Sequence, residues 1–251
     1  MEDAVATPSW VLIAYLIAGI CFIVALRGLS SPVSSQRGNR FGMIGMAIAV
    51  VTTLLVHQVA GLLEIFAAIA VGGAIGLVTA RRIQMTAMPQ LVAAFHSLVG
   101  VAAVLVGVAA FLNPLAFGIV NIDPGNAFAD LVPINPASRI ELGLGVAIGA
   151  ITFSGSVIAF LKLNGNMSGS PILLPARHVL NLGTLVAILG LIAYFTQDQA
   201  PWVFFTIVAL AFAIGFLLII PIGGADMPVV ISMLNSYSGL GRGGDGLHAA
   251  Q

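Results

Sequence analysis

His96, Asn235 and Ser156 each lie inside an apolar stretch of the sequence. Histidine titrates near physiological pH, so a histidine with amide and hydroxyl neighbours can accept a proton and pass it on. If these stretches cross a membrane, their polar groups are costly there and normally face a bundle interior or a wet cavity. The three residues are therefore candidates for a proton path. The alternative is that a neutral His96 only holds helices together, and that Asn235 and Ser156 only join helices by hydrogen bonds.

Two segments of the chain match each other without a gap, residues 88–100 and residues 227–239. Both open with Met-Pro, and both carry His or Asn followed by Ser-x-x-Gly. Proline is common in the first helical turn, so Met-Pro alone carries little weight, but the shared second part is harder to dismiss. His96 and Asn235 correspond in this register, each about 10 Å into its helix at 1.5 Å per residue. Both helices would start on the same side, so the repeat is parallel rather than inverted.

Ser156 is expected at the same depth from the other direction. Its apolar run has the opposite sense and ends near Lys162, which puts Ser156 about 9 Å from that end. The sequence therefore predicts that a histidine, an asparagine and a serine meet in one layer of the membrane.

The composition is that of a polytopic membrane protein. The chain has 251 residues, of which 59% are hydrophobic and 7% are charged, and its formal net charge is zero. Its mean hydropathy is +1.10. An ordinary soluble domain has about a quarter charged residues, so a soluble enzyme, a nucleic-acid binder and a disordered chain are excluded. Cys21 is the single cysteine, and no His, Cys or carboxylate pair has the spacing of a metal site.

Seven apolar runs are long enough to cross a bilayer, which takes roughly 20 residues. An eighth run begins near Met227 and is cut short. The expected fold is all-α, a transmembrane bundle of about seven complete helices and a truncated eighth. The seven runs are Ser9–Leu26, Phe41–Val56, Ala60–Ala80, Pro89–Leu112, Ser138–Leu161, Val179–Phe195 and Pro201–Ile220.

Basic residues gather in the connections that follow the first, third and fifth runs. By the positive-inside rule these connections are cytoplasmic, and the N-terminus is outside. Two carboxylates then lie near helix ends. Glu141, on the outer side beside Arg139, could line an entrance, but ion pairing at the interface is the simpler explanation. Asp226, on the cytoplasmic side just before the eighth run, could cap that helix or couple to something on the cytoplasmic face.

The segment GGADMPVVISMLNSYSG, residues 223–239, resembles the signature of the beta subunit of proton-translocating NAD(P) transhydrogenase. The resemblance runs in order from about Val11 to Gly239. That family's beta subunit has nine membrane helices with the N-terminus outside, followed by a cytoplasmic NADP(H)-binding domain. The other matching stretches are RGNRFG at 37–42, GGAIG at 72–76, FHSLVG at 95–100, TFSGS at 152–156 and LPARH at 174–178.

The resemblance implies an enzyme subunit in which inward proton flow drives hydride transfer from NADH, on the alpha subunit, to NADP+, on the beta subunit's soluble domain. It implies proton-path roles for His96, Asn235 and Ser156, and coupling or accessory roles for Asp226 and Glu141. It also implies the alpha subunit as partner, a homodimer of the alpha–beta unit, and a bacterial cytoplasmic (inner) membrane. No nucleic-acid partner is expected.

The sequence departs from this pattern after Gly239. We expect residues 1–239 to form the proton-translocating domain and residues 240–251 to be an aberrant or disordered tail, from a frameshift or a natural truncation. Gly239–Gly244 fits G-x-G-x-x-G, but no strand precedes it, so it is expected to be a chance match. The chain alone is then expected to bind no nucleotide and to be inactive. The competing interpretations are an independent small-solute secondary transporter, with the repeat as its pseudo-symmetry, and an inactive fragment.

Overall fold

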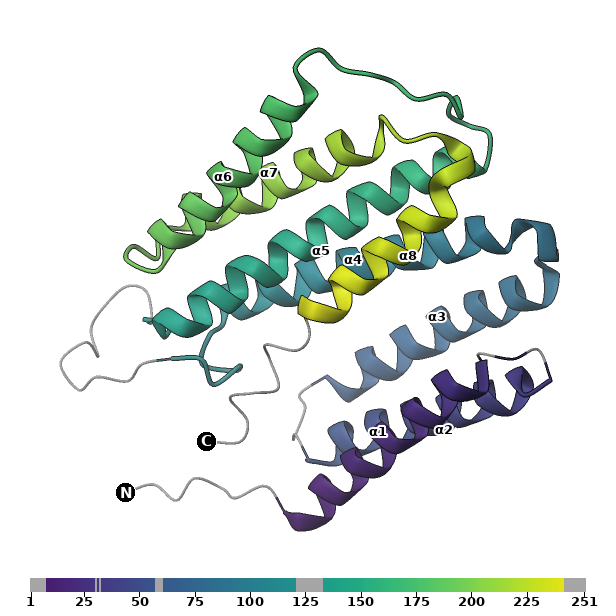
Figure 1. Ribbon diagram of the computed structural model, residues 1–251. Coiled ribbons are helices and arrows are strands. Elements are labelled where there is room, and N and C mark those ends of the chain that lie inside the picture. Colours follow the sequence, from purple (N-terminus) through teal and green to yellow (C-terminus); the bar gives the residue numbers. More distant parts are fainter. Residues whose placement is uncertain (1–7, 30, 32, 57–60, 121–132, 242–251) are drawn as a thin grey trace. The chain divides into compact units, whose positions relative to one another are not determined.

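The computed structural model describes residues 8–29, 31, 33–56, 61–120 and 133–241. The regular elements of these residues are all helical, and the one β-type contact among them is an isolated bridge between Val120 and Ile134. Eight α-helices account for most of the described chain (Figure 1). The all-α prediction is therefore confirmed.

Seven of these helices are long and apolar enough to cross a membrane, and the eighth is shorter. This confirms the seven runs and the short eighth expected from the sequence. The helices are α1 Ser9–Leu29, α2 Ser35–Val56, α3 Leu62–Arg82, α4 Met88–Leu112, α5 Pro136–Leu163, α6 Arg177–Phe195, α7 Pro201–Ile219 and α8 Met227–Gly241.

The chain divides into two compact units, Met1–Arg81 and Arg82–Gln251. In the first unit, α1 and α2 pack against each other as a hairpin. Gly28 and Gly38 allow this contact, because a Cβ atom on Gly28 would lie 2.6 Å from the Gly38 Cα atom. Small residues at such crossings let helix backbones approach closely.

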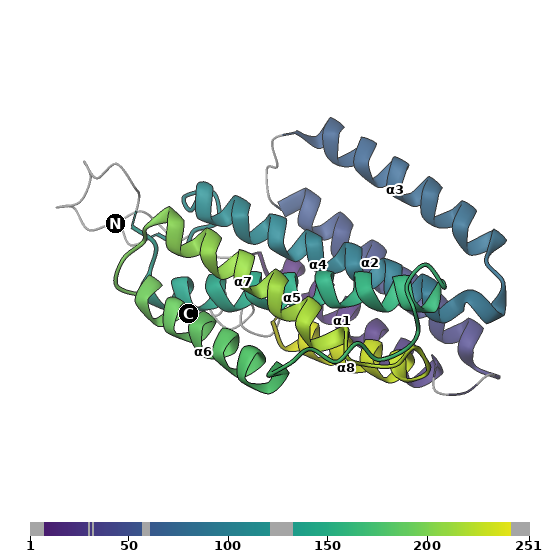
Figure 2. The same cartoon turned by 90° about the horizontal axis from the view of Figure 1, so that it is seen from above.

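The second unit is built around α5, which contacts α4, α6, α7 and α8. In both views α8 lies along the C-terminal half of α5 (Figures 1 and 2). Glycines make these contacts close. Gly149 of α5 lies against α4, and Gly215 of α7 lies against the Ile151 carbonyl of α5, which an added Cβ would approach to 2.8 Å. The central helix is thus lined by small residues because several neighbours pack on it.

Two apolar clusters hold the second unit together, one toward each end of α5. Near the start of α5, Phe111 of α4 stacks on Phe204 of α7 with ring centroids 4.4 Å apart. Near its end, Met227 and Leu234 of α8 pack with Ala159 of α5. We call these the Arg139 end and the Lys162 end of the unit, after the cation that α5 carries at each.

The two repeated segments begin in the same way. A short 3-10 turn, Met85–Ala87, leads directly into α4, and a second one, Gly224–Asp226, leads directly into α8. Each α-helix then opens with Met-Pro, where proline's missing N–H group costs nothing because the first turn has no acceptor for it. The repeat seen in the sequence is therefore a repeat of local structure as well.

Candidate functional site

His96 lies on the face of α4 that packs against α5. Gly100 and Gly107 follow it at helical spacing on the same face, and all three residues are buried. The residue is 7% exposed. An ionisable side chain buried between apolar helices is expensive, so its position favours a specific role over surface solvation.

Gly100 sets the level at which α4 meets α5. A Cβ atom on Gly100 would lie 2.5 Å from the Phe153 backbone nitrogen and 2.8 Å from the Gly149 carbonyl oxygen. The two helices run in opposite directions (Figure 1). The α4 turn before Gly100, which carries His96, therefore faces the α5 turn after Phe153, which carries the fully buried Ser156.

α8 reaches the same level through Gly155. A Cβ atom on Gly155 would lie 3.3 Å from the Leu234 Cδ1 atom. Asn235 follows Leu234 in α8, so its backbone is at the level of Ser156. The side chain of Asn235 lies outside the described part of the structure. The meeting of all three side chains therefore stays a prediction.

Two buried hydroxyl groups near this level stand out. Within the described residues, the side-chain oxygens of Thr152 and Ser156 are buried and have no hydrogen-bond partner. A buried hydroxyl normally finds a partner, and water is the usual one where protein groups are absent. The sequence did not single out Thr152 as a site residue. The available signal was its place one turn before Ser156 on the same face of α5.

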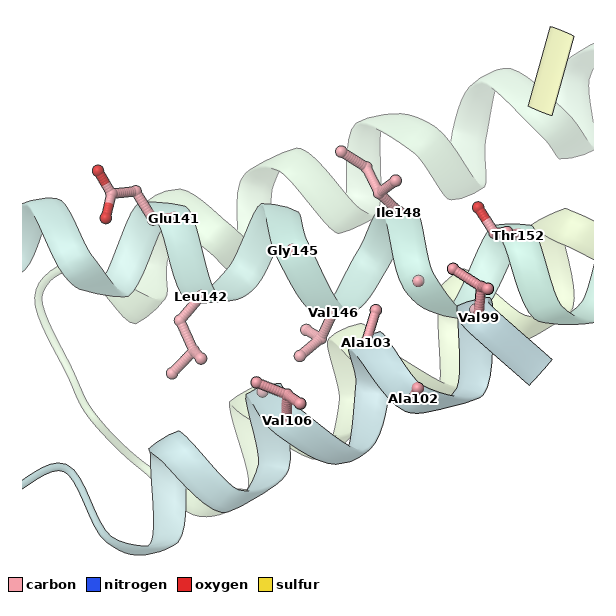
Figure 3. Close-up of a pocket in the computed structure, with 13 residues that line it drawn as sticks. Val99, Ala102, Ala103, Val106, Glu141, Leu142, Gly145, Val146, Ile148 and Thr152 are labelled. Carbon is pink, nitrogen blue, oxygen red and sulfur yellow. The ribbon is translucent and has the colours of Figure 1, made fainter. Parts of the chain in front are cut away.

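A groove of about 300 Å³ runs between α4 and α5 on the Arg139 side of this level. Its α4 wall includes Ala103 and Val106, and its α5 wall includes Gly145 (Figure 3). Glu141 and Thr152 border it toward opposite ends of the α5 stretch (Figure 3). At 1.5 Å per residue these two polar side chains are about 16 Å apart along the helix. The groove therefore extends from a half-buried carboxylate to the first of the two unpartnered hydroxyls.

Asp226 is not part of the His96 layer. It is exposed and ends the 3-10 turn before α8, about 13 Å from Asn235 along the helix axis. Lys162, by contrast, is buried at this end of the unit, where its ammonium group donates hydrogen bonds to backbone carbonyls. In the sequence Lys162 marked only a helix end, because the carbonyls that hold it come mainly from residues far along the chain.

Residues 11–251 match the family model of the NAD(P) transhydrogenase beta subunit. The chain belongs to this family. It is 55% identical over 240 residues to NAD(P) transhydrogenase subunit beta of Rhodospirillum rubrum, and to the same subunit of a designated strain of that species. Each match covers 96% of this chain and 50% of the relative. The chain thus spans about half the length of the curated relatives it matches.

The family match reaches further along the chain than the resemblance seen in the sequence. It continues to residue 251, whereas the sequence alone led us to expect the resemblance to end at Gly239. Leu240 and Gly241 are the last residues of α8, and the expected division of the chain at Gly239 stays a prediction. The expected disorder of the remaining tail falls on residues 242–251, which lie outside the described structure.

Proposed function

We propose that this chain is the membrane-spanning, proton-translocating part of a proton-translocating NAD(P) transhydrogenase. Inward proton flow through it is coupled to hydride transfer from NADH to NADP+. The observation that carries the proposal is the buried His96, whose helical turn faces Ser156 in a chain of this family. Histidine is the side chain best suited to gain and lose a proton near neutral pH.

The proposed path begins at Glu141 and follows the groove between α4 and α5 to Thr152. Thr152 and Ser156 offer hydroxyl groups that can each donate and accept a hydrogen bond, as proton transfer through water requires. His96 and Asn235 complete the layer, and Asp226 lies beyond it at the Lys162 end. In this path protons enter at Glu141 and leave near Asp226, so each of these two carboxylates has a role at one end of the path.

Coupling arises from what protonation does to the imidazole. Neutral His96 has one N–H donor and one acceptor nitrogen, whereas the protonated form has two donors. Its neighbours on α5 and α8 must rearrange their hydrogen bonds to suit each form. This rearrangement biases the conformation of the nucleotide-binding parts of the enzyme that contact these helices. The size of this coupling is limited by the difference in free energy between the two arrangements.

We place the Lys162 end on the cytoplasmic side, because the basic residues gather in the connections at the ends of α1, α3 and α5. The N-terminus is then outside, and the membrane is the bacterial cytoplasmic (inner) membrane. NADP(H) is held by the half of the family's length that this chain does not span, and NAD(H) by an alpha subunit. The working unit is a homodimer of alpha–beta units.

The groove gives a test that leaves helix packing intact. A Cβ atom on Gly145 would meet nothing within 4 Å, so the side chain of Gly145→Leu starts in open space at the groove and extends into it. In the complete transhydrogenase, we expect this variant to lower proton translocation and the coupled hydride transfer at least tenfold. Both are measured in sealed vesicles, with the amount of inserted protein matched.

Gly190→Leu is the matched control, since Gly190 of α6 is equally open and lies outside the groove. It should retain at least half of the wild-type rates. Equal rates for Gly145→Leu and Gly190→Leu would show that protons do not pass along this groove.

A further inference from the structure

Lys162 is a buried cation whose hydrogen-bond partners are backbone carbonyls. The residue is 5% exposed. The Nζ atom donates to the carbonyl oxygens of Ile220 at 2.6 Å, Ile222 at 2.7 Å and Ser170 at 3.4 Å. An ammonium group has three N–H donors, so the three carbonyls can take up its full donor capacity. Ile220 also caps the C-terminus of α7, where the helix dipole favours a positive charge.

These carbonyls belong to two separate connections of the chain, residues 164–176 between α5 and α6 and residues 220–226 between α7 and α8. Two backbone hydrogen bonds also join the connections directly. The Ile172 N–H group donates to the Ile220 carbonyl at 3.3 Å, and the Gly224 N–H group donates to the Gly169 carbonyl at 2.8 Å. Lys162 thus ties α5 to a pair of connections that are already bonded to each other.

The α7–α8 connection leads directly to Asp226 and to the buried first residue of α8, Met227. On its other side, Lys162 is six residues from Ser156 on the same helix, about 9 Å along the axis. One rigid helix therefore carries both a member of the proton-path layer and the cation that holds the connection before α8. Helix α5 therefore links the level of Ser156 to the level of the α7–α8 connection.

We propose that Lys162 is a positioning residue that makes the α7–α8 connection, with Asp226 and the start of α8, move together with α5. The proposal rests on the proposed function, because the motion matters only if α5 responds to proton transfer. A shift of α5 that broke these contacts would leave a buried ammonium without acceptors, which is strongly unfavourable. The connection must therefore follow the helix.

Arg139 offers a matched comparison at the other end of α5. Its guanidinium donates to the carbonyl oxygens of Ile134 at 2.9 Å and Thr196 at 3.2 Å, and Thr196 caps the C-terminus of α6. Both cations of α5 therefore bind carbonyls at the end of a neighbouring helix. Only Lys162 is connected to Asp226 and α8. A purely stabilising role predicts that loss of either cation lowers stability and leaves the proton-to-hydride ratio unchanged, whereas a positioning role predicts a changed ratio for Lys162 alone.

The test compares Lys162→Met and Arg139→Met in the complete transhydrogenase. Methionine keeps the unbranched shape of lysine and removes its charge and donors. By hydrogen-exchange mass spectrometry, we expect amide exchange in residues 220–226 to rise at least tenfold in Lys162→Met and to change less than twofold in Arg139→Met. In sealed vesicles, protons translocated per hydride transferred should fall below half the wild-type ratio in Lys162→Met alone.

Unchanged amide exchange at residues 220–226 in Lys162→Met would overturn the claim that Lys162 holds the α7–α8 connection. Faster exchange with a normal proton-to-hydride ratio would overturn the positioning role and leave only a helix cap. Failure of the proposed function looks different, because His96→Ala would then translocate protons normally whatever happens at Lys162.

A second variant covers the case in which Lys162→Met does not assemble. Inserting two glycines between Gly224 and Ala225 leaves Lys162, its carbonyls and the Gly224–Gly169 hydrogen bond in place but separates them from Asp226 by a flexible spacer. The proposal expects the proton-to-hydride ratio to fall below half, while amide exchange at residues 220–222 stays within twofold of wild type. A normal ratio in this variant would refute the proposal.

Discussion

An alanine at Gly100 tests the packing that brings the His96 turn against α5. The added Cβ atom would lie 2.5 Å from the Phe153 nitrogen and 2.8 Å from the Gly149 oxygen. Both are backbone atoms of a helix and cannot rotate away. Ordinary contacts begin at 3.4 Å, so α4 and α5 must separate by about 0.9 Å at this point. Overpacking of this kind costs about 1–3 kcal/mol.

Alanine also favours the helix over glycine by about 1 kcal/mol, so the net loss for Gly100→Ala should be about 0–2 kcal/mol. The measurement is reversible unfolding in mixed detergent micelles, followed by circular dichroism. Gly183→Ala on α6 is the control, because an added Cβ there meets nothing within 4 Å, and it should be as stable as wild type or more so. Equal stability of the two variants would refute the close crossing of α4 and α5.

Two further predictions follow from the buried hydroxyls and from the helical character of the described chain. Thr152→Val removes a buried hydroxyl that has no partner among the described residues, so the free energy of unfolding should stay within about 1 kcal/mol of wild type. Proton translocation in sealed vesicles should fall severalfold. An unchanged translocation rate would show that Thr152 is not part of the proton path. The purified 251-residue chain should bind no NADPH, because its described elements are helices and a dinucleotide site needs a βαβ unit. Saturable micromolar binding of NADPH, measured by calorimetry, would overturn this prediction.

The sequence predicted the helices well where they are apolar and less well where they are not. The fourth run was expected to start at Pro89 and end at Leu112, and α4 runs from Met88 to Leu112. The second run was expected to start at Phe41, but α2 begins at Ser35. The intervening residues are polar, and hydropathy cannot follow a helix that continues out of the apolar region.

The candidate site was predictable where distance along a helix decides it. The rise of 1.5 Å per residue was enough to expect His96 and Ser156 at one level, and Gly100 places their turns face to face. Lys162 was not predictable in this way. Two of its acceptors, Ile220 and Ile222, are remote in the sequence, and backbone carbonyls leave no pattern of side chains to recognise.

Proton translocation by His96→Ala in the complete transhydrogenase is the most direct test of the central claim, that the proton passes through this side chain. Alanine removes the titratable group and leaves the apolar helix able to insert. We predict that the variant reaches the membrane in normal amounts and loses most of both proton translocation in sealed vesicles and the coupled hydride transfer. Normal proton pumping by correctly inserted His96→Ala would contradict the account.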